Sequence, residues 1–134
     1  MKEKNLKEQI NNIRQQAGAS GCVYSFPWVY KSLKEIGITS YAVDIKSGKA
    51  VISHKEEKLE EQAPEKNFVF GAFNIEQIVA AIQKHQKGET SYDEWLQEVA
   101  HAGVFRYVVT MAQDMVIYLD QNNTQAYVEP IPSV

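Results

Sequence analysis

The sequence contains a single cysteine, Cys22, and this scarcity excludes several kinds of stabilisation and chemistry. One cysteine cannot form a disulfide within the chain, nor can it supply a thiolate-rich metal site. The composition therefore fits a reducing compartment, and we expect a cytoplasmic protein. A chain of 134 residues can bury about two-thirds of its unfolded surface, so it needs no disulfide or structural metal for stability.

Long apolar runs and basic clusters are missing as well. No run approaches the ~20 apolar residues of a membrane-spanning helix, and the charged N-terminus MKEKNLKEQINNIRQQ lacks the apolar region of a secretory signal. The net charge is −3 and the Lys and Arg residues are scattered, which does not favour nucleic acid or a membrane surface as partner. Apolar residues make up 44% of the chain, so we expect one globular domain spanning residues 1–134.

The first half of the sequence shows the pattern of two helices followed by two strands. Apolar residues recur at spacings of three and four over about residues 3–17, which predicts an amphipathic helix. Ser25, with a proline two positions later, begins a second helix that Gly37 ends. Residues 38–45 and 49–54 are rich in β-branched side chains and flank a Ser-Gly turn, so they predict a β-hairpin.

A charged segment separates the two halves. Residues 55–67 have no apolar period, and Pro64 would break a helix, so we interpret them as a solvated connector. The apolar run FVFGAF at 68–73 fits either a short strand or a packed segment.

The second half repeats the same order of elements. Asn74 begins a helix that Gly88 ends, and Ser91 with Glu94 has the spacing of a capping box at the start of the next helix. Strands are predicted at about 104–111, 114–120 and 125–131.

The two halves also align with each other. Ser25–His54 matches Ser91–Asp120 without a gap, and both the N-cap serines and the C-cap glycines fall on equivalent positions. We therefore predict an α+β fold of two tandem helix-helix-hairpin repeats, at about 3–54 and 68–131. The repeats would be related by a pseudo-twofold axis and would share a mainly antiparallel sheet.

A seam between two such repeats is a place where a cleft can form. We expect Trp28, Tyr30, Trp95 and Tyr107 to line it. The resulting hypothesis is a non-enzymatic module that binds a small molecule or a protein partner there. The dense aromatic stretch around Trp28 has an alternative interpretation as a hydrophobic staple that holds the entry of its helix.

An enzyme is the second hypothesis. Cys22 precedes a helix start, where a thiol pKa can be lowered, although it belongs to no known local signature of a catalytic cysteine. The pair His101 and Glu129 could instead act as acid and base. Either arrangement requires two such groups within hydrogen-bond reach in a pocket.

Metal and cofactor sites find little support. The histidines are His54, His85 and His101, and no two of them have the spacing that places ligands on one helical face. The glycine-containing stretch AGASG at 17–21 follows a predicted helix rather than a strand, unlike a nucleotide-binding turn. We therefore expect no metal and no cofactor.

Self-association is a third hypothesis. The last predicted strand, 125–131, contains Pro130, which is typical of a sheet edge. An exposed edge strand could pair with a second copy of the chain, so a homodimer is possible.

The stretch His85–Pro132 carries a distinctive set of residues: Gln86, Gly88, Glu89, Tyr92, Ala100, Ala102, Gly103, Tyr107, Val108, Val109, Tyr118, Val128, Glu129 and Pro132. With these residues it resembles a family of small bacterial and prophage proteins known as domain of unknown function 1398, whose members often carry the label "phage envelope protein". The first half resembles the family more loosely, through Gly37, Tyr41 and the hairpin after them. The family often has His at the position of Tyr127 and Cys at that of Leu96, so the resemblance implies no metal or thiol role there. It implies the fold and no established activity.

Overall fold

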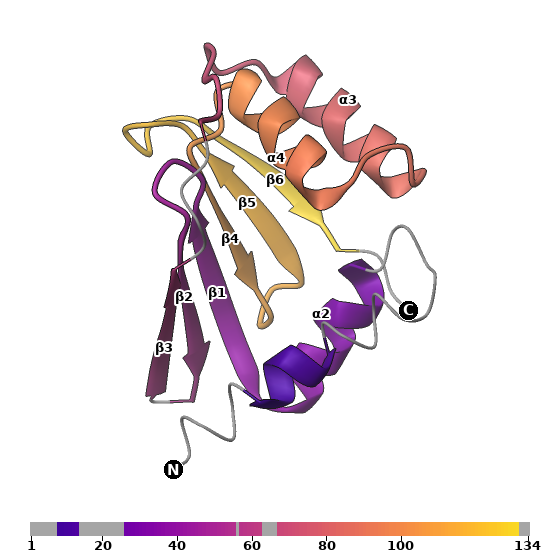
Figure 1. Ribbon diagram of the computed structural model, residues 1–134, viewed down its shortest axis with the longest axis vertical. Helices are drawn as coiled ribbons and strands as arrows, with labels where there is room; N and C mark the ends of the chain where they lie inside the picture. The colour runs from indigo at the N-terminus through magenta and orange to yellow at the C-terminus, as the bar shows by residue number, and fades with distance from the viewer. Residues whose placement is uncertain (1–7, 14–25, 56, 63–66, 132–134) are drawn as a thin grey trace.

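A computed structural model of the chain describes residues 8–13, 26–55, 57–62 and 67–131, with side chains from residue 29 onward in the second range. Residues 8–13 are helical. The further helices are α2 (Phe26–Glu35), α3 (Ile75–Gln86) and α4 (Tyr92–His101), and the strands are β1 (Ile38–Asp44), β2 (Lys49–His54), β3 (Glu57–Gln62), β4 (Arg106–Thr110), β5 (Met115–Leu119) and β6 (Ala126–Pro130) (Figure 1).

The strands form one six-stranded sheet in the order β3-β2-β1-β4-β5-β6. Every neighbouring pair is antiparallel. The strands β1 and β4 lie at the centre, and β3 and β6 are the edges. The prediction of an α+β fold with a mainly antiparallel sheet is confirmed.

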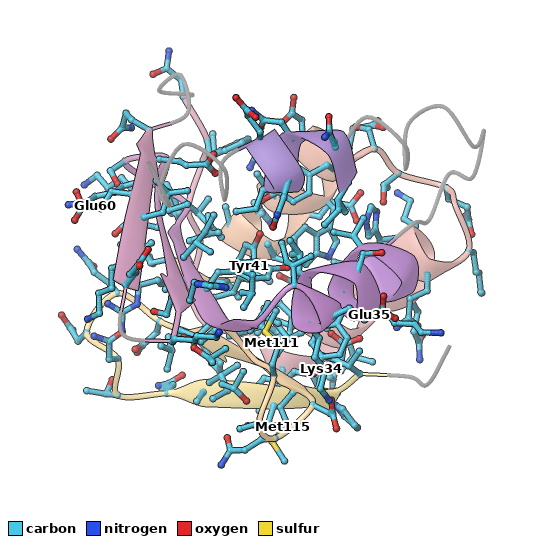
Figure 2. The ribbon with its side chains drawn as sticks, turned by 90° about the horizontal axis from the view of Figure 1, so that it is seen from below. Lys34, Glu35, Tyr41, Glu60, Met111 and Met115 are labelled. Atoms are coloured by element: carbon cyan, nitrogen blue, oxygen red, sulfur yellow. The ribbon has the colours of Figure 1, made fainter. Side chains whose placement is uncertain are left out.

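The helices cover one face of this sheet, as Figure 1 shows. Buried and partly exposed side chains alternate along β4 and β5 because only one face is covered and successive strand residues point to opposite faces. Tyr107, Val109, Val116 and Tyr118 are buried, whereas the residues between them are partly exposed. In Figure 2, Tyr41 and Met111 lie on the helix side, while Glu60 and Met115 lie on the outer side. The core therefore sits between the helices and this face.

The other face of the sheet carries an apolar row. Ala42 pairs with Val51 and Val108, Val108 pairs with Ile117, and Ile117 pairs with Val128. These side chains share one face because directly paired residues in an antiparallel sheet point to the same side. All are partly or fully accessible, and Val128 on the edge strand is 45% exposed.

The N-terminal caps of the second-half helices agree with the sequence prediction. The Asn74 side chain accepts a hydrogen bond from the backbone N–H of Gln77 at the start of α3. Ser91 and Glu94 form the predicted capping box at the start of α4. Each cap satisfies backbone donors that a helix start leaves without partners.

The charged segment 55–67 was expected to be a connector, but it contains a strand. The residues of β3 pair along the whole of β2, and Leu59, opposite Ile52, is buried. A single apolar side chain among charged neighbours produces no apolar periodicity, so the sequence pattern does not predict this strand. The charges suit an edge, because they discourage pairing with other chains.

The apolar run 68–73 is a packed segment and not a strand. Its backbone is held to the end of α4, since the N–H of Gly71 donates to the Ala100 carbonyl at 3.1 Å. The ring of Phe70 stacks on that of Phe105, with centroids 4.2 Å apart. This segment leads the chain from the first half into α3.

No helix in the described part of the chain combines the length and the apolar character that crossing a membrane requires.

Candidate functional site

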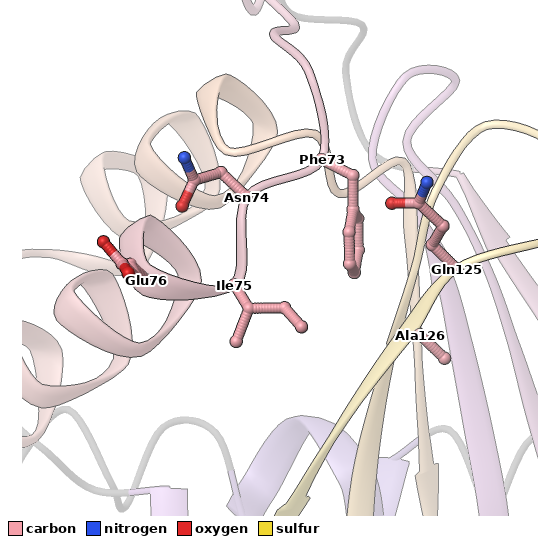
Figure 3. Close-up of a pocket in the computed structure, with 6 residues that line it drawn as sticks. All are labelled: Phe73, Asn74, Ile75, Glu76, Gln125 and Ala126. Atoms are coloured by element: carbon pink, nitrogen blue, oxygen red, sulfur yellow. The ribbon is translucent and has the colours of Figure 1, made fainter.

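The described surface has an open groove between α3 and β6, made of two hollows that follow each other along the edge strand. The first has a volume of about 660 Å³ and lies where α3 begins. Figure 3 shows the side chains of Phe73 and Ile75 pointing toward β6, and those of Asn74 and Glu76 pointing away from it. Gln125 and Ala126 form the opposite wall. We call the two hollows together the α3–β6 groove.

The second hollow has a volume of about 450 Å³ and continues toward the end of α3. Its helical wall consists of Val79, Ile82, Gln83 and Gln86, a spacing that places the four side chains on one stripe of α3. Its other wall comes from the end of the chain: Tyr127, Glu129, Pro130 and Ile131. The groove thus has apolar side chains in its middle and polar side chains at both ends, Asn74, Glu76 and Gln125 at one end and Gln86 and Glu129 at the other.

Glu129 supplies the ionisable group of the second hollow. The Tyr118 hydroxyl donates to Oε1 of Glu129 at 2.6 Å, and Nε2 of Gln86 donates to Oε2 at 2.9 Å. Burial raises the pKa of Glu129 above its ordinary value, and the hydrogen bond from Tyr118 opposes that shift. The carboxyl group is therefore held in place by donors on two elements, α3 and β5.

An aromatic cluster lies beneath Glu129 and supports it. Trp95 of α4 packs edge-on against Tyr107 and Tyr118, with centroids 5.5 and 6.2 Å apart, and Tyr118 stacks on Tyr127 at 6.2 Å. The hydroxyls of Tyr92 and Tyr107 are hydrogen-bonded at 2.6 Å. Burial raises the pKa of Tyr107 well above its ordinary value, so this phenol stays neutral. These ring contacts fix the position of the Tyr118 side chain, whose hydroxyl donates to Glu129.

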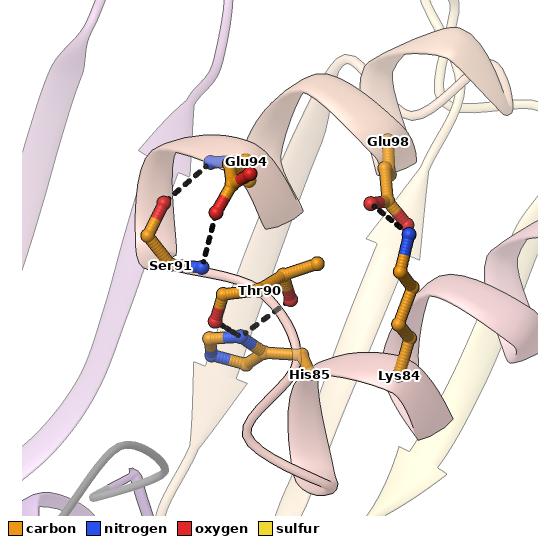
Figure 4. A network of polar contacts seen from close by, with 6 residues as sticks. All are labelled: Lys84, His85, Thr90, Ser91, Glu94 and Glu98. Atoms are coloured by element: carbon orange, nitrogen blue, oxygen red, sulfur yellow. Dashed lines mark hydrogen bonds and ion pairs between the residues drawn. The ribbon is translucent and has the colours of Figure 1, made fainter.

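The turn between α3 and α4 is fixed by polar contacts (Figure 4). The ring of His85 stacks on Trp95 at 5.4 Å, and its Nδ1 lies 3.0 Å from the carbonyl oxygen of Thr90. Burial lowers the pKa of His85 below its ordinary value. Lys84 forms an ion pair with Glu98 at 3.3 Å. These contacts position the last turn of α3, from which Gln86 reaches Glu129.

The backbone of β6 faces outward at alternate residues. The N–H of Asp120 donates to the Gln125 carbonyl, and the N–H of Ile131 donates to the Asp114 carbonyl. Since pairing in an antiparallel ladder alternates, the N–H and C=O groups of Ala126 and Val128 point away from β5. Pro130 falls in this outward set, where its missing N–H costs no ladder hydrogen bond.

Three of the four aromatic residues expected to line a cleft at the seam are core residues. Tyr30, Trp95 and Tyr107 are 6%, 7% and 5% exposed. Tyr30 donates to the side chain of Asp114 at the β4–β5 turn, and so ties α2 to the second hairpin. None of the three lines the α3–β6 groove. The side chain of Trp28 lies outside the described residues.

The proposed catalytic pair of His101 and Glu129 does not meet. Cys22 lies outside the described residues. Glu129 bonds to Gln86 in the last turn of α3. His101 is the last residue of α4, and its backbone lies beside Gly71, which precedes α3. His101 and Glu129 therefore lie toward opposite ends of the helical layer.

His54 and His85 also occupy structural positions. Nε2 of His54 lies 2.9 Å from the Ile36 carbonyl at the end of α2. Among the described residues, no group of three or more His, Cys, Asp or Glu side chains is arranged to hold a metal ion.

The sequence marks Glu129 as a candidate acid or base but does not indicate which residues contact it. Gln86 and Tyr118 are 43 and 11 positions away along the chain. The alternation of Tyr127 and Glu129 along the last strand places both on one face, and this was the available signal that the acid points toward the helices.

A comparison with curated proteins finds no match to the chain. A comparison with protein families matches residues 7–130, nearly the whole chain, to the family described as "Protein of unknown function (DUF1398)". The expected resemblance is confirmed over both halves, and the chain belongs to this family.

Proposed function

We propose that this protein is a non-enzymatic binding module that receives an extended segment of a partner protein in the α3–β6 groove. The observation that carries the proposal is the combination of an edge strand and a flanking helix. The backbone groups of Ala126 and Val128 point outward from β6, and α3 supplies a wall along the same strand. Proteins that bind peptides by strand addition use this arrangement.

The open shape of the groove favours a peptide over a small molecule. Small-molecule sites usually enclose most of their ligand. Here the side chains that line the first hollow are mostly exposed, including Asn74, Ile75, Gln125 and Ala126. The two hollows together follow the whole of β6. A strand-shaped ligand fits such a surface better than a compact one.

The contacts of Glu129 support binding rather than catalysis. Nucleophilic catalysis needs a nucleophile with an activating base within hydrogen-bond reach. Glu129 is hydrogen-bonded to a phenol and an amide, from Tyr118 and Gln86. Neither group is a base near neutral pH.

The test is selection of peptides from a random displayed library, followed by amide chemical-shift mapping with the selected peptide. We expect shifts to concentrate in residues 74–86 and 125–131. Val128→Pro removes an outward N–H and should weaken binding up to about tenfold, the effect of losing one hydrogen bond. Val128→Thr keeps the N–H and should bind as the unchanged protein does.

Equal binding by Val128→Pro and Val128→Thr would contradict strand addition. Shifts that map to another surface would contradict the site. Native mass spectrometry of the gently purified protein distinguishes the alternatives, because a retained small molecule or a dimer would appear as extra mass.

We also infer that the two halves are structural repeats, as their alignment suggests. Support comes from the register of β1 and β4, in which Tyr41 pairs with Val109 and Val43 pairs with Tyr107. The sequence alignment equates Tyr41 with Tyr107 and Val43 with Val109, so this register is the one that a pseudo-twofold axis would produce. A chain that joins two copies of residues 67–131 is then expected to fold. A disordered product would contradict the inference.

The single cysteine supports a cytoplasmic location for such a module. Cell fractionation tests this location, and recovery of the protein outside the cytoplasm would contradict it.

A further inference from the structure

We propose that the peptide recognised by the α3–β6 groove carries a basic side chain that pairs with Glu129, and apolar side chains two and four residues away from it. This inference rests on the proposed function and specifies the ligand. It follows from three features of the groove: the alternation of a strand added to β6, the charge of Glu129 at one end, and the apolar side chains that the helical side presents along the rest.

The alternation determines which peptide residues enter the groove. Side chains that lie opposite each other on adjacent strands point to the same face of the sheet. Tyr127 and Glu129 point toward the helices, as their contacts with Tyr118 and Gln86 show. A peptide residue opposite Glu129 therefore points into the groove, and so do the residues opposite Tyr127 and Gln125.

The charge at the far end of the groove favours a cation. Each oxygen of the Glu129 carboxyl group accepts one described hydrogen bond, and a carboxylate oxygen can accept more than one. Gln86 is the last residue of α3, so the partially negative end of that helix adds to the same potential. Lys84, two residues before Gln86, forms its ion pair with Glu98 on α4.

The remaining groove walls select apolar groups. Opposite Tyr127, the wall of α3 presents Val79 and Ile82. Opposite Gln125, the first hollow presents Phe73 and Ile75, whose side chains point toward β6 in Figure 3. A basic residue followed at every second position by an apolar one matches these walls in order. The peptide can run in either direction, which reverses the order but preserves the spacing.

The test uses two pairs of synthetic peptides and isothermal titration calorimetry. The basic probes are acetyl-Thr-Lys-Thr-Val-Thr-Val-Thr-amide and its reversed order, and the neutral probes replace Lys by norleucine. We expect one of the basic probes to bind about tenfold more tightly than its norleucine partner, since a charge-assisted hydrogen bond contributes about that factor.

Glu129→Gln should reduce this ratio to about one, because glutamine keeps hydrogen-bonding capacity toward Tyr118 and Gln86 but has no charge. The matched control is Glu60→Gln, which removes one negative charge from the exposed, opposite edge of the sheet. It should leave the ratio at about tenfold.

The outcomes separate the inference from the proposed function. Suppose that the Lys and norleucine probes bind the unchanged protein equally and that the amide chemical-shift changes map to the groove. The groove then binds peptides, but Glu129 does not select a cation. If no probe binds at millimolar concentration and library selection also fails, the proposed function and the inference are both wrong. If Glu60→Gln lowers the ratio as much as Glu129→Gln, overall charge rather than the groove determines the preference.

Discussion

At the scale of single residues, the carboxyl group of Glu129 shows burial and hydrogen bonding acting in opposite directions. Burial disfavours the charged form, and the Tyr118 hydroxyl favours it. Burial dominates, so the pKa of Glu129 is raised above its ordinary value of 4.5. A group that is harder to ionise in the folded state than in the unfolded chain makes the stability depend on pH.

The sign of that dependence can be measured. Because the folded state retains the proton to higher pH, the contribution of Glu129 is fully present below about pH 4.5 and is lost as the pH rises through its folded pKa. The free energy of unfolding of Glu129→Gln, relative to that of the unchanged protein, should therefore increase as the pH rises from about 4.5 to the folded pKa of Glu129. Above that pKa the difference should level off. Urea denaturation at a series of pH values provides the measurement.

Tyr118→Phe serves as the companion variant in that series. Loss of the hydroxyl removes the hydrogen bond that opposes the shift, so the pKa of Glu129 should rise further. The contribution of Glu129 to stability should then persist to higher pH before it is lost. Its loss at a lower pH would show that the Tyr118 hydroxyl does not stabilise the carboxylate.

Gly103 is a second position where a single residue determines a local structure. Its φ is +92°, and an added Cβ would lie 2.3 Å from the backbone of Phe73. Gly37 has a similar φ of +96°, but there the nearest atom, at 2.9 Å, belongs to the movable ring of His54. Gly37→Ala should cost about 1–2 kcal/mol from the left-handed conformation alone.

Gly103→Ala should cost roughly 4 kcal/mol or more, because the backbone of Phe73 must also move. Urea denaturation of the two variants measures the difference. Equal costs would mean that the segment around Phe73 shifts easily.

At the scale of elements, α4 is stabilised at its start by the capping box. The Ser91 side chain accepts from the backbone N–H of Glu94 at 3.1 Å, and the Glu94 carboxylate accepts from the N–H of Ser91 at 2.9 Å. Ser91→Ala should lower the free energy of unfolding by about 1 kcal/mol. Ser91→Asp preserves a hydrogen-bond acceptor at the cap, so its free energy of unfolding should decrease much less. A loss of the same size in both variants would assign the effect to the side-chain environment rather than to the cap.

The two edge strands differ in a way that bears on partners. The strand β3 carries Glu57, Lys58, Glu60 and Glu61, and such charges discourage edge pairing. The strand β6 exposes Val128 and carries one charge, on Glu129, which points toward the helices. A partner strand should therefore add to β6 rather than to β3.

At the scale of the whole molecule, burial on one side of the sheet should make adjacent residues respond differently to the same substitution. Val109 is fully buried under the helices, and Val108 lies on the opposite, partly exposed face. Val109→Asp should unfold the protein, since an unpaired buried carboxylate costs several kcal/mol.

Val108→Asp should remain folded in the same measurement. Far-UV circular dichroism and urea denaturation distinguish the two variants. If Val108→Asp unfolds as well, a partner or a second copy must cover the outer face.

The sequence by itself determined the local elements and the fold class. Cap residues, terminal glycines and apolar periodicity depend on near neighbours, so α3, α4 and the two hairpins could be predicted. The strand β3 could not, because its single buried side chain, Leu59, stands among charges. Its pairing with β2 depends on a partner strand rather than on its own composition.

Only the tertiary structure decided which residues form the candidate site. Trp95 and Tyr107 have the aromatic character of a cleft wall, yet the packing of α4 on the sheet buries them. Glu129 was a candidate from its place in an apolar strand, but its contacts join that strand to the neighbouring β5 through Tyr118 and to α3 through Gln86, which is 43 positions away. A pattern of residue types records local preference, whereas a groove between a helix and an edge strand exists only after both have packed on the same sheet.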